Sequence, residues 1–393
     1  MNVTASQHIQ SLKLGIFNEL TQTKRRLAVL GKDLIDLSVG SPDLPPPDFI
    51  KEALIHYAKQ DDAYGYTLGA LPSFHHAVAS LYERRYGVSL QPETEVLQLI
   101  GSQEGLTHLP AALINPGDVV LAPDPGYPAY EAGIRLAGGQ LVPMPLCEEN
   151  GYFPRLDLIP SEIAERAKLM FLNYPANPVT AVATLDFFKE VVRFAKKHHI
   201  LVVHDYAYSE LTFDNHHSPS FLSVPGAKEV GVEFNSLSKT FSMAGCRIAY
   251  MVGHPQVIRI LATVHSNTHY GIFQPIQKAA EVALTEGEAY IREMNLTYLK
   301  RRDALVAELH ASGWRVTSPP ATMFVWAQTP GNRPSREFAF RLLEEAGVVL
   351  TPGQAFGENG EGYVRISLVQ PEARLREAAA RIGTFLAQAP SAL

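Results

Sequence analysis

The sequence predicts an α/β protein, with a large domain built on a seven-stranded, mostly parallel sheet sandwiched by helices and a smaller α+β domain after it. The 393 residues are enough for two or three domains with large cores. Short apolar runs alternate with longer amphipathic runs through the middle of the chain, which is typical of strands separated by helices. After about Thr285 this alternation gives way to a long, charged helical pattern. That change of pattern predicts the second domain.

The first 45 residues lead into the segment Ser41-Pro42-Asp43-Leu44-Pro45-Pro46-Pro47. Proline lacks the backbone donor that a helix interior or a central strand needs, so this segment is neither. We expect residues 1–45 to form an N-terminal arm or a part of the small domain. Residues 46–285 are the predicted large domain, and residues 286–393 are the predicted small domain.

Seven short apolar runs are the predicted strands of the large sheet. Runs with helical spacing lie between them, and Gly and Pro residues mark the turns. The predicted strands are Val96–Ile100, Val119–Ala122, Gln140–Met144, Leu169–Leu172, Leu201–His204, Val230–Phe234 and Ile248–Val252. The clearest helical runs among them are Leu71–Arg85, Leu185–His198 and Gln256–Val264.

The predicted small domain begins with its longest helix and contains fewer strands. Its elements are the helix Ile291–Ser312, strands near Trp314–Thr317 and Met323–Trp326, the helix Arg336–Ala346, the alternating strand Tyr363–Leu368 and the closing helix Pro371–Ala387.

Composition and charge exclude several classes of protein. Hydrophobic residues make up 46% of the chain and charged residues 19%, which is ordinary globular usage and not that of a disordered or fibrous protein. The formal net charge is −6, and there is no dense basic block. Charge alone therefore favours neither nucleic acid nor an anionic membrane as a partner.

Cysteine usage and the N-terminus predict a cytoplasmic protein. Cys147 and Cys246 cannot build a disulfide framework and show no zinc spacing. Residues 1–13 lack the apolar core of a signal peptide, and no run approaches the length of a membrane span. We expect no metal, because the adjacent histidines of the pairs His75-His76, His198-His199 and His216-His217 diverge and suit a solvated surface.

Four polar features follow predicted strands at their carboxyl ends, where open α/β sheets bind ligands. The first is Gly101-Ser102-Gln103-Glu104-Gly105-Leu106. Glycine lets the backbone approach a ligand, and the free N–H groups at a helix start attract an anion such as phosphate. A strand-to-helix turn also needs glycine for its own geometry, so this motif alone leaves both interpretations open.

The second and third features supply an acid and an amide. Asp205 follows the strand Leu201–His204, and a carboxylate is costly to bury there without a cation or strong donors. A helix N-cap is the structural alternative for this Asp. Tyr208 can present its phenol to the same place. Asn177 lies in a loop that neighbouring prolines stiffen, so its amide has a fixed direction.

The fourth feature is Ser236-Leu237-Ser238-Lys239, with Arg247 eight residues beyond the lysine. Desolvation lowers the pKa of a lysine near the end of a buried strand, and a partly neutral amine is a nucleophile that can form a Schiff base. The serine hydroxyls and the planar guanidinium suit a phosphate dianion. A solvated loop lysine is the alternative. Together the four features meet the requirements of pyridoxal 5′-phosphate (PLP).

The chain resembles the class I/II aminotransferases of PLP fold type I. The matching residues, in the family's order and spacing, are Asn177-Pro178, Asp205 with Tyr208, Ser236-Leu237-Ser238-Lys239 with Arg247, and Tyr363-Val364-Arg365-Ile366-Ser367. The resemblance runs from about Gly40 to the C-terminus. Longer stretches, including His204-Asp205-Tyr206-Ala207-Tyr208-Ser209-Glu210, look most like the branch that contains LL-diaminopimelate and alanine aminotransferases.

The resemblance implies a role for each matching residue that would meet the cofactor ring. Lys239 would hold the cofactor covalently and act in catalysis. Asp205 would pair with the pyridinium nitrogen, while Asn177 and Tyr208 would hydrogen-bond the ring 3′-oxygen. Tyr127 would stack on the ring face.

The resemblance also implies contacts to the phosphate and to the substrate. The phosphate would be held by Ser102, Gln103, Ser236 and Arg247, and by Tyr64 of a neighbouring subunit, which implies a homodimer with shared sites. Arg365 would clamp the α-carboxylate of the substrate, helped by Asn177 and the backbone at Gly40.

Three positions depart from the family pattern. Val179-Thr180 stands where the family usually has Thr-Gly, Cys246 where a Trp often precedes the arginine, and His269-Tyr270 where the related branch usually has Asp and a small hydroxyl residue. These departures concern substrate choice more than cofactor binding. Side-chain recognition is expected from Leu14-Gly15-Ile16-Phe17, from Tyr66 and from the partner subunit.

The expected activity is transfer of an amino group from an L-amino acid to a 2-oxo acid by a ping-pong mechanism. A PLP-dependent carbon–sulfur β-lyase on the same fold is the alternative, since Lys239 and Asp205 would serve α-proton removal equally well. A cofactor-binding module of a transcription regulator is a more distant alternative. It would need a fused DNA-binding segment, and the first 40 residues are too short and too weakly basic for one.

Overall fold

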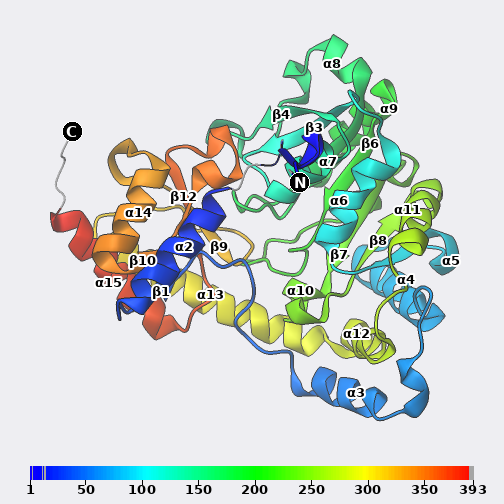
Figure 1. Cartoon of the computed structure of the whole chain (residues 1–393), viewed down its shortest axis with the longest axis horizontal. Helices are drawn as coiled ribbons and strands as arrows, with labels where there is room; N and C mark the ends of the chain where they lie inside the picture. Colours follow the sequence, from blue (N-terminus) through cyan, green and yellow to red (C-terminus); the bar gives the residue numbers. More distant parts are fainter. Residues whose placement is uncertain (2, 11, 13–14, 389–393) are drawn as a thin grey trace.

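The computed structural model of the chain describes residues 1, 3–10, 12 and 15–388. Its centre is the seven-stranded sheet expected from the sequence (Figure 1). The strands lie in the order β2-β8-β7-β6-β5-β3-β4, with β8 antiparallel to both neighbours and the other pairs parallel. Their bounds are β2 Val96–Leu99, β3 Val119–Asp124, β4 Gln140–Pro145, β5 Ala167–Asn173, β6 Leu201–Asp205, β7 Gly231–Ser236 and β8 Ala249–Gly253. The seven predicted strands are thus confirmed, with ends shifted by one or two residues.

Helices cover both faces of this sheet. On one face, α6 (Ser102–Leu113), α7 (Pro128–Leu136) and α11 (Pro255–Thr268) pack on the sheet in one buried apolar cluster. On the other face, α4 (Pro72–Tyr86), α9 (Leu185–His198) and α12 (Gln274–Glu286) share a second and larger cluster. Successive side chains of a strand point to opposite faces of the sheet and so enter the two clusters in turn. The strands are therefore apolar on both faces.

The register of the central strands brings their polar ends together. Asn173, the last residue of β5, lies opposite Asp205, the last residue of β6. Asp205 in turn lies opposite Phe234 of β7, two residues before Ser236. Because β5, β6 and β7 are parallel, their carboxyl ends meet at one edge of the sheet, where an α/β fold binds its ligand.

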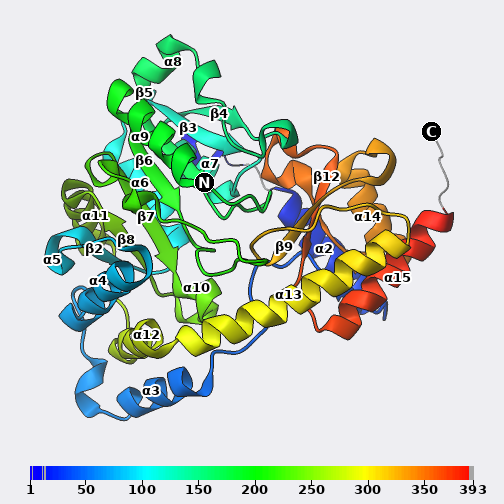
Figure 2. The same ribbon diagram turned by 180° about the vertical axis from the view of Figure 1, so that it is seen from behind.

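The C-terminal part packs around a core that it shares with the N-terminal segment and with the segment after β6. It contains the antiparallel sheet β11-β12-β9 and a third apolar cluster that joins the long helix α13 to the closing helix α15 (Figure 2). The elements are α13 Glu288–Ala311, β9 Phe324–Gln328, α14 Ser335–Ala346, β10 Val348–Val349, β11 Thr351–Pro352, β12 Tyr363–Ser367 and α15 Glu372–Gln388.

The strand predicted near Trp314–Thr317 is wrong. The backbone there is an irregular loop after α13. Trp314 is buried in the cluster of the C-terminal part, and its indole N–H donates to the carbonyl oxygen of Gln328 at 2.8 Å. The apolar residues of this segment therefore pack without joining a sheet.

The N-terminal segment is more ordered than the expected arm. The helix α2 (Ile16–Val29) buries Leu20 and Leu27 against Leu343 and Val349, and the short strand β1 (Ile35–Asp36) pairs in parallel with β10. The proline-rich residues 41–47 then lead to α3 (Asp48–Ala58), away from the C-terminal part (Figure 1). These contacts support a proposal that residues 1–45 and 286–393 form one domain and residues 46–285 another.

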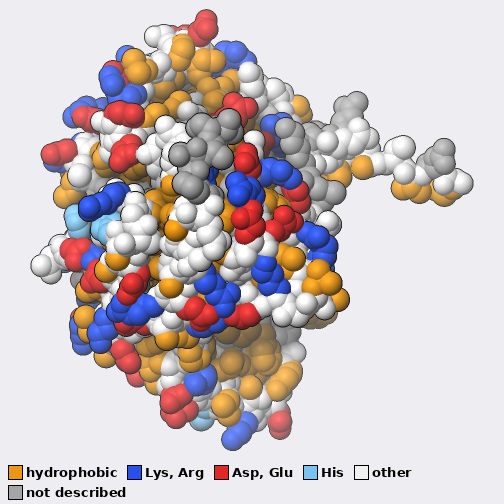
Figure 3. Space-filling view, turned by 90° about the vertical axis from the view of Figure 1, so that its left-hand side faces the viewer, with side chains coloured by type: hydrophobic (Ala, Val, Ile, Leu, Met, Phe, Trp, Pro, Cys, Tyr) orange, Lys and Arg blue, Asp and Glu red, His pale blue; other side chains and the backbone are white. Residues whose placement is uncertain are grey.

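The remaining α-helices are short: α1 Gln7–Gln10, α5 Pro92–Glu95, α8 Ser161–Arg166 and α10 Leu237–Thr240. Within the described residues, every helix is too short or too polar to cross a bilayer. Figure 3 shows Lys and Arg side chains interspersed with Asp and Glu, and hydrophobic side chains gathered toward the lower end of that view, where α3 lies.

Candidate active site

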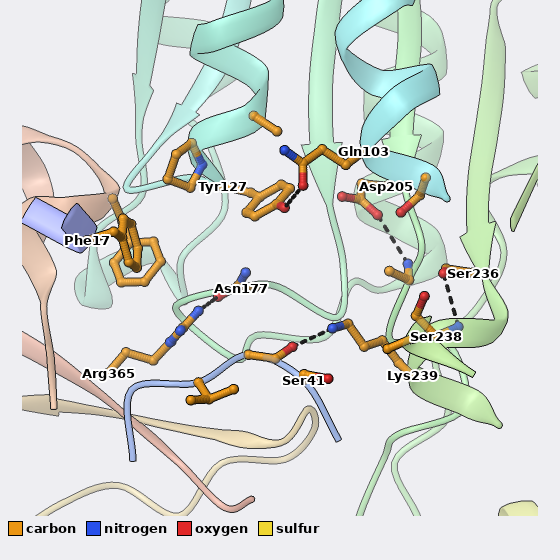
Figure 4. A pocket seen from close by; sticks show the side chains of 18 of the residues that line it. Phe17, Ser41, Gln103, Tyr127, Asn177, Asp205, Ser236, Ser238, Lys239 and Arg365 are labelled. Carbon is orange, nitrogen blue, oxygen red and sulfur yellow. Dashed lines mark hydrogen bonds between the residues drawn. The ribbon is translucent and has the colours of Figure 1, made fainter. Parts of the chain in front are cut away.

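A cavity of about 710 Å³ opens at the carboxyl ends of β5, β6 and β7, between the large sheet and the C-terminal part. Its walls come from α2, the segment Ser38–Ser41, α6, α7, α10 and β12 (Figure 4). The site residues expected from the sequence that line it are Gly40, Ser102, Gln103, Tyr127, Asn177, Asp205, Tyr208, Ser236, Lys239, Arg247 and Arg365. The fold thus gathers eleven of the twelve expected residues into one cavity, and the twelfth, Tyr64, lies elsewhere.

Lys239 is carried by α10, the single helical turn that follows β7. The hydroxyl of Ser236 caps this turn by accepting from the N–H of Ser238 at 3.1 Å. The Lys239 amine donates to the carbonyl oxygen of Gly40 (Figure 4). Burial, together with the nearby Arg365 cation, lowers the pKa of Lys239 to about 8, against the opposing effect of Asp205. A much larger fraction of this amine than of an ordinary lysine is therefore neutral and nucleophilic near pH 8.

Asp205 is a buried acid already supplied with hydrogen bonds. Its Oδ2 accepts from the hydroxyl of Tyr130 at 2.8 Å, and its Oδ1 accepts from the N–H of Ala207 at 3.2 Å. Burial raises the pKa of Asp205, while those two hydrogen bonds, His204 and Lys239 act in the opposite direction. A cation placed beside this carboxylate would compensate its desolvation, as a protonated ring nitrogen would.

Asn173 and Tyr130 are site residues that sequence reasoning missed. The Nδ2 of Asn173 donates to the carbonyl oxygen of Asp205 at 2.8 Å, and its Oδ1 accepts from the N–H of Asn177 at 2.7 Å. Asn173 therefore ties the ends of β5 and β6 to the loop that carries Asn177. Asn173 could have been predicted as a site residue, because it is a polar residue at the end of a buried strand. Tyr130 could not, because it lies inside the helix α7.

Arg365 is a buried cation on β12 that faces the cavity. Its Nη1 donates to Oδ1 of Asn177 at 2.8 Å and its Nη2 to the carbonyl oxygen of Ser38 at 3.0 Å. The guanidinium lies over the ring of Phe324, 4.1 Å from the centroid, and its Nε has no hydrogen-bond partner within the described chain. Burial lowers the pKa of Arg365 to about 10. A substrate carboxylate would supply the missing charge partner.

The opposite end of the cavity suits an anion. Ser102 and Gln103 begin the twelve-residue helix α6, so their N–H groups lie at its positive end. Gly101 has a φ of 77°, and a Cβ at this position would overlap the guanidinium of Arg247. Glycine therefore makes the space in which Arg247 approaches the helix start. Tyr127 closes this end, where its hydroxyl donates to Oε1 of Gln103 at 2.9 Å.

Tyr64 is not part of this cavity. Its side chain is exposed, its hydroxyl donates to the carbonyl oxygen of Ala58 at 2.8 Å, and its ring lies 5.3 Å from that of Phe273. Tyr66 is also exposed and does not line the cavity, whereas Phe17 does. Leu14 lies outside the described residues.

The residues that depart from the family pattern lie in different surroundings. Thr180 is buried in the left-handed region with a φ of 63°, where a glycine would carry no Cβ strain. Cys246 is half-buried beside Arg247, and burial raises the pKa of its thiol. His269 lies at the end of α11, and Tyr270 follows it on the surface.

These residues fit PLP. A lysine with a lowered pKa, a buried carboxylate, and an anion cradle formed by a helix start and an arginine surround one cavity of sufficient size for a small cofactor. The Nε of Arg365, without a hydrogen-bond partner within the described residues, leaves a donor in the same cavity for a second anion. Fold and site together define a PLP-dependent enzyme of fold type I.

Comparison with known proteins identifies the family. The family model described as aminotransferase class I and II matches residues 32–382, and the chain belongs to this family. It is a PLP-dependent aminotransferase, as the sequence predicted.

Similar proteins cover almost the whole chain. LL-diaminopimelate aminotransferase of Desulforudis audaxviator is 46% identical over 97% of this chain and 98% of the relative, and that of Moorella thermoacetica is 44% identical over the same shares. Among solved structures, substrate-bound BacF from Bacillus subtilis is 40% identical, covers 98% of both chains and superposes with a TM-score of 0.94. The names of these relatives favour transamination over the β-lyase alternative.

Proposed function

We propose that Lys239, Asp205 and Arg365 carry the aminotransferase reaction in this cavity. The observation that supports this most directly is the Lys239 amine, buried and with a lowered pKa, in one cavity with a buried carboxylate and a guanidinium whose Nε has no hydrogen-bond partner within the described residues. When bound, PLP supplies an electron sink for the pair released from the Cα–H bond of the substrate.

Each residue has a task that follows from its position. Arg365 binds the α-carboxylate in bidentate fashion and so fixes the direction of the Cα–H bond. Lys239 holds the cofactor until substrate binds, and its freed neutral amine then accepts the Cα proton. Asp205 keeps a proton on the ring nitrogen by its negative charge, because a carboxylate at that place favours the cationic form.

The remaining contacts position the cofactor. The oxygen of the Asn177 amide already accepts from Arg365, so its Nδ2 is the atom left to donate to a ring oxygen together with Tyr208. Ser102, Gln103, Ser236 and Arg247 would bind the phosphate and Tyr127 would cover the ring, since all five line the cavity. Gly40 accepts from Lys239 and forms part of the substrate pocket.

Lys239→Ala tests this assignment. We expect turnover to fall by more than about a thousandfold, because base and covalent attachment are lost together, and the visible absorbance of the bound cofactor to shift to that of a non-covalent complex. Lys196→Ala, at an exposed lysine paired with Glu229, is the matched control and keeps both. Multiple-turnover transamination by Lys239→Ala at the wild-type rate would contradict the proposal.

We further propose LL-diaminopimelate as the first candidate substrate, on the names of the relatives. The distal end of the cavity is formed by α2, where Phe17 and Leu20 present an apolar wall and Lys24 a cation that pairs with Asp36 at 2.8 Å. The wall suits a methylene chain, and Lys24 suits a distal carboxylate.

Lys24→Met tests this substrate assignment. We expect KM for LL-diaminopimelate to rise by about tenfold, as for the loss of one charge-assisted hydrogen bond, and KM for alanine to stay unchanged. The measurement is the initial rate with a common 2-oxo acid. Equal effects on both amino acids would show that Lys24 does not recognise the distal carboxylate.

A homodimer and a cytoplasmic location also belong to the proposal. Tyr64, Tyr66, Leu68 and Tyr270 are large exposed side chains in neighbouring segments, and the rings of Tyr66 and Tyr270 lie 5.0 Å apart. Such a group suits an interface with a second copy, from which Tyr64 would reach the other cofactor phosphate. The two unpaired cysteines suit a reducing compartment.

A further inference from the structure

A cluster of histidines and one glutamate lies next to the phosphate end of the cavity. Glu104 and His108 are one turn apart on α6, and His265 and His269 are one turn apart at the end of α11. The two pairs face each other where these helices pack together. The Oε1 of Glu104 lies 2.7 Å from Nδ1 of His108, 2.9 Å from Nε2 of His265 and 4.0 Å from Nε2 of His269.

Three atoms of this cluster lack hydrogen-bond partners within the described chain. They are Oε2 of Glu104 and the Nε2 atoms of His265 and His269, and each is buried. His265 is only 5% exposed. Its Nε2 lies 2.9 Å from Oε1 of Glu104, a contact that is an ion pair when the imidazole is protonated. Buried polar atoms are normally satisfied, so the unpartnered Nε2 atoms of His265 and His269, both beside the Glu104 carboxylate, indicate a ligand between the three side chains.

The spacing suits a metal ion. One ligand atom from each of Glu104, His265 and His269 lies within 4.8 Å of the other two. Ligands at about 2.0–2.1 Å from a tetrahedral zinc ion are about 3.3 Å apart, so small side-chain rotations bring the three into range. Two imidazoles and one carboxylate favour zinc over magnesium or calcium, which prefer oxygen ligands throughout.

We propose that Glu104, His265 and His269 bind a zinc ion, with a water molecule as the fourth ligand. His108 does not bind the metal ion but positions the Glu104 carboxylate, because its Nδ1 contacts Oε1 of Glu104. The N–H of Gly271 lies 3.2 Å from Nδ1 of His269. Coordination at Nε2 leaves the proton of a neutral imidazole on Nδ1, so this contact opens when zinc binds.

The site would fasten two helices of the large domain. Glu104 lies in the first turn of α6, directly after Gln103, and His269 lies at the end of α11. A metal ion there ties the start of α6 to α11 and takes no part in the proposed proton transfers. Its contribution is to stability, since an ion bound by the folded chain alone raises the free energy of unfolding.

The test is zinc binding by the holoenzyme after treatment with a chelator and removal of the chelator. Zinc is added in excess, unbound metal is removed by gel filtration, and the retained metal is counted by mass spectrometry. Calorimetric titration gives the affinity. We expect one zinc ion per chain for the wild type and about a hundredfold weaker binding for His269→Gln and for His265→Gln. The double variant His216→Gln/His217→Gln, which removes two exposed histidines, is the control and binds as the wild type does.

His269→Gln decides the question if His265→Gln fails to fold, because His269 lies nearer the surface. Cobalt gives a second readout, since a four-coordinate site intensifies its visible bands and loss of an imidazole ligand removes that intensity. Retention of one tightly bound zinc by His269→Gln, or no retained zinc in the wild type, would overturn the proposal.

Discussion

At the scale of single residues, burial makes the chemistry of Lys239 available near neutral pH. The same cavity lowers the pKa of Lys239 to about 8 and that of Arg365 to about 10, in both cases chiefly by desolvation. The two cations also disfavour each other, as the effect of Arg365 on Lys239 shows. An incoming carboxylate and a phosphate relieve this excess of positive charge, so the site is built for anions.

A pH profile tests the lowered lysine pKa. In the apoprotein, the neutral fraction of the Lys239 amine grows as pH rises through about 8. We therefore expect acylation of Lys239, followed by mass spectrometry of its peptide, to reach half its maximal rate near pH 8. An unperturbed lysine does so only near about pH 10.4. A midpoint at that ordinary value would show that the amine is solvated.

The sequence predicted the site residues that directly follow apolar strands or lie in marked loops, such as Asp205, Asn177 and Lys239. Their polarity stands out against the runs before them. Tyr130 could not be found this way, because a tyrosine within an amphipathic helix is normally a packing residue. The sequence did not indicate the proposed zinc site, because Glu104 and His265 come together only through the packing of α6 on α11, although the i, i+4 spacing of His265 and His269 was present in the sequence.

At the scale of elements, the turn from β2 into α6 sets the phosphate end of the site. Gly101 adopts a positive φ and leaves room for Arg247, whose own φ is 53°. The helix start and the guanidinium would then face the proposed phosphate from two sides. This arrangement therefore depends on the absence of a Cβ atom at Gly101 as much as on the presence of Arg247.

Gly101→Ala tests that dependence. We expect cofactor affinity, measured by titrating the apoprotein, to fall by about tenfold or more, because the new Cβ displaces the Arg247 guanidinium. Gly117→Ala is the matched control, since Gly117 also has a positive φ, 89°, but faces open space. An equal loss of cofactor affinity in the two variants would show that backbone strain causes the effect, and not displacement of the Arg247 guanidinium.

The elements differ in how well the sequence predicted them. The strands of the large sheet are short apolar runs and were placed to within two residues. The helix α2 was missed because it buries only Leu20 and Leu27 and its remaining face is polar. The segment Trp314–Thr317 was predicted to be a strand, yet it is an irregular loop whose residues Trp314 and Val316 pack in the same apolar cluster as α13. In both cases tertiary packing decided the outcome.

At the scale of the whole molecule, the cavity forms where three parts of the chain meet. The N-terminal segment supplies Gly40, the strand β6 supplies Asp205, the helix α10 after β7 supplies Lys239, and the C-terminal part supplies Arg365. A movement of the C-terminal part would shift Arg365 and Gly40 together relative to Lys239. If Arg365 binds the substrate carboxylate as proposed, such a movement would change the orientation of the substrate relative to Lys239.

The proposed dimer predicts a concentration-dependent activity. Leu68 is 77% exposed beside the aromatic side chains of Tyr66 and Tyr270. We expect Leu68→Glu to weaken association, measured by sedimentation, and to lower cofactor affinity, because Tyr64 of the second copy no longer reaches the phosphate. Leu158→Glu, at another exposed leucine, is the control and leaves both unchanged. A wild-type chain that sediments as a fully active monomer would contradict this proposal.

The central claim is that the amine of Lys239 holds the cofactor and moves the proton. Borohydride reduction of the holoenzyme, followed by peptide mass spectrometry, tests it most directly, because reduction makes an imine between lysine and cofactor permanent. We expect the cofactor label on Lys239 alone, with complete loss of transamination in proportion to the labelled fraction. A label on a different lysine, or full activity with Lys239 labelled, would contradict the account.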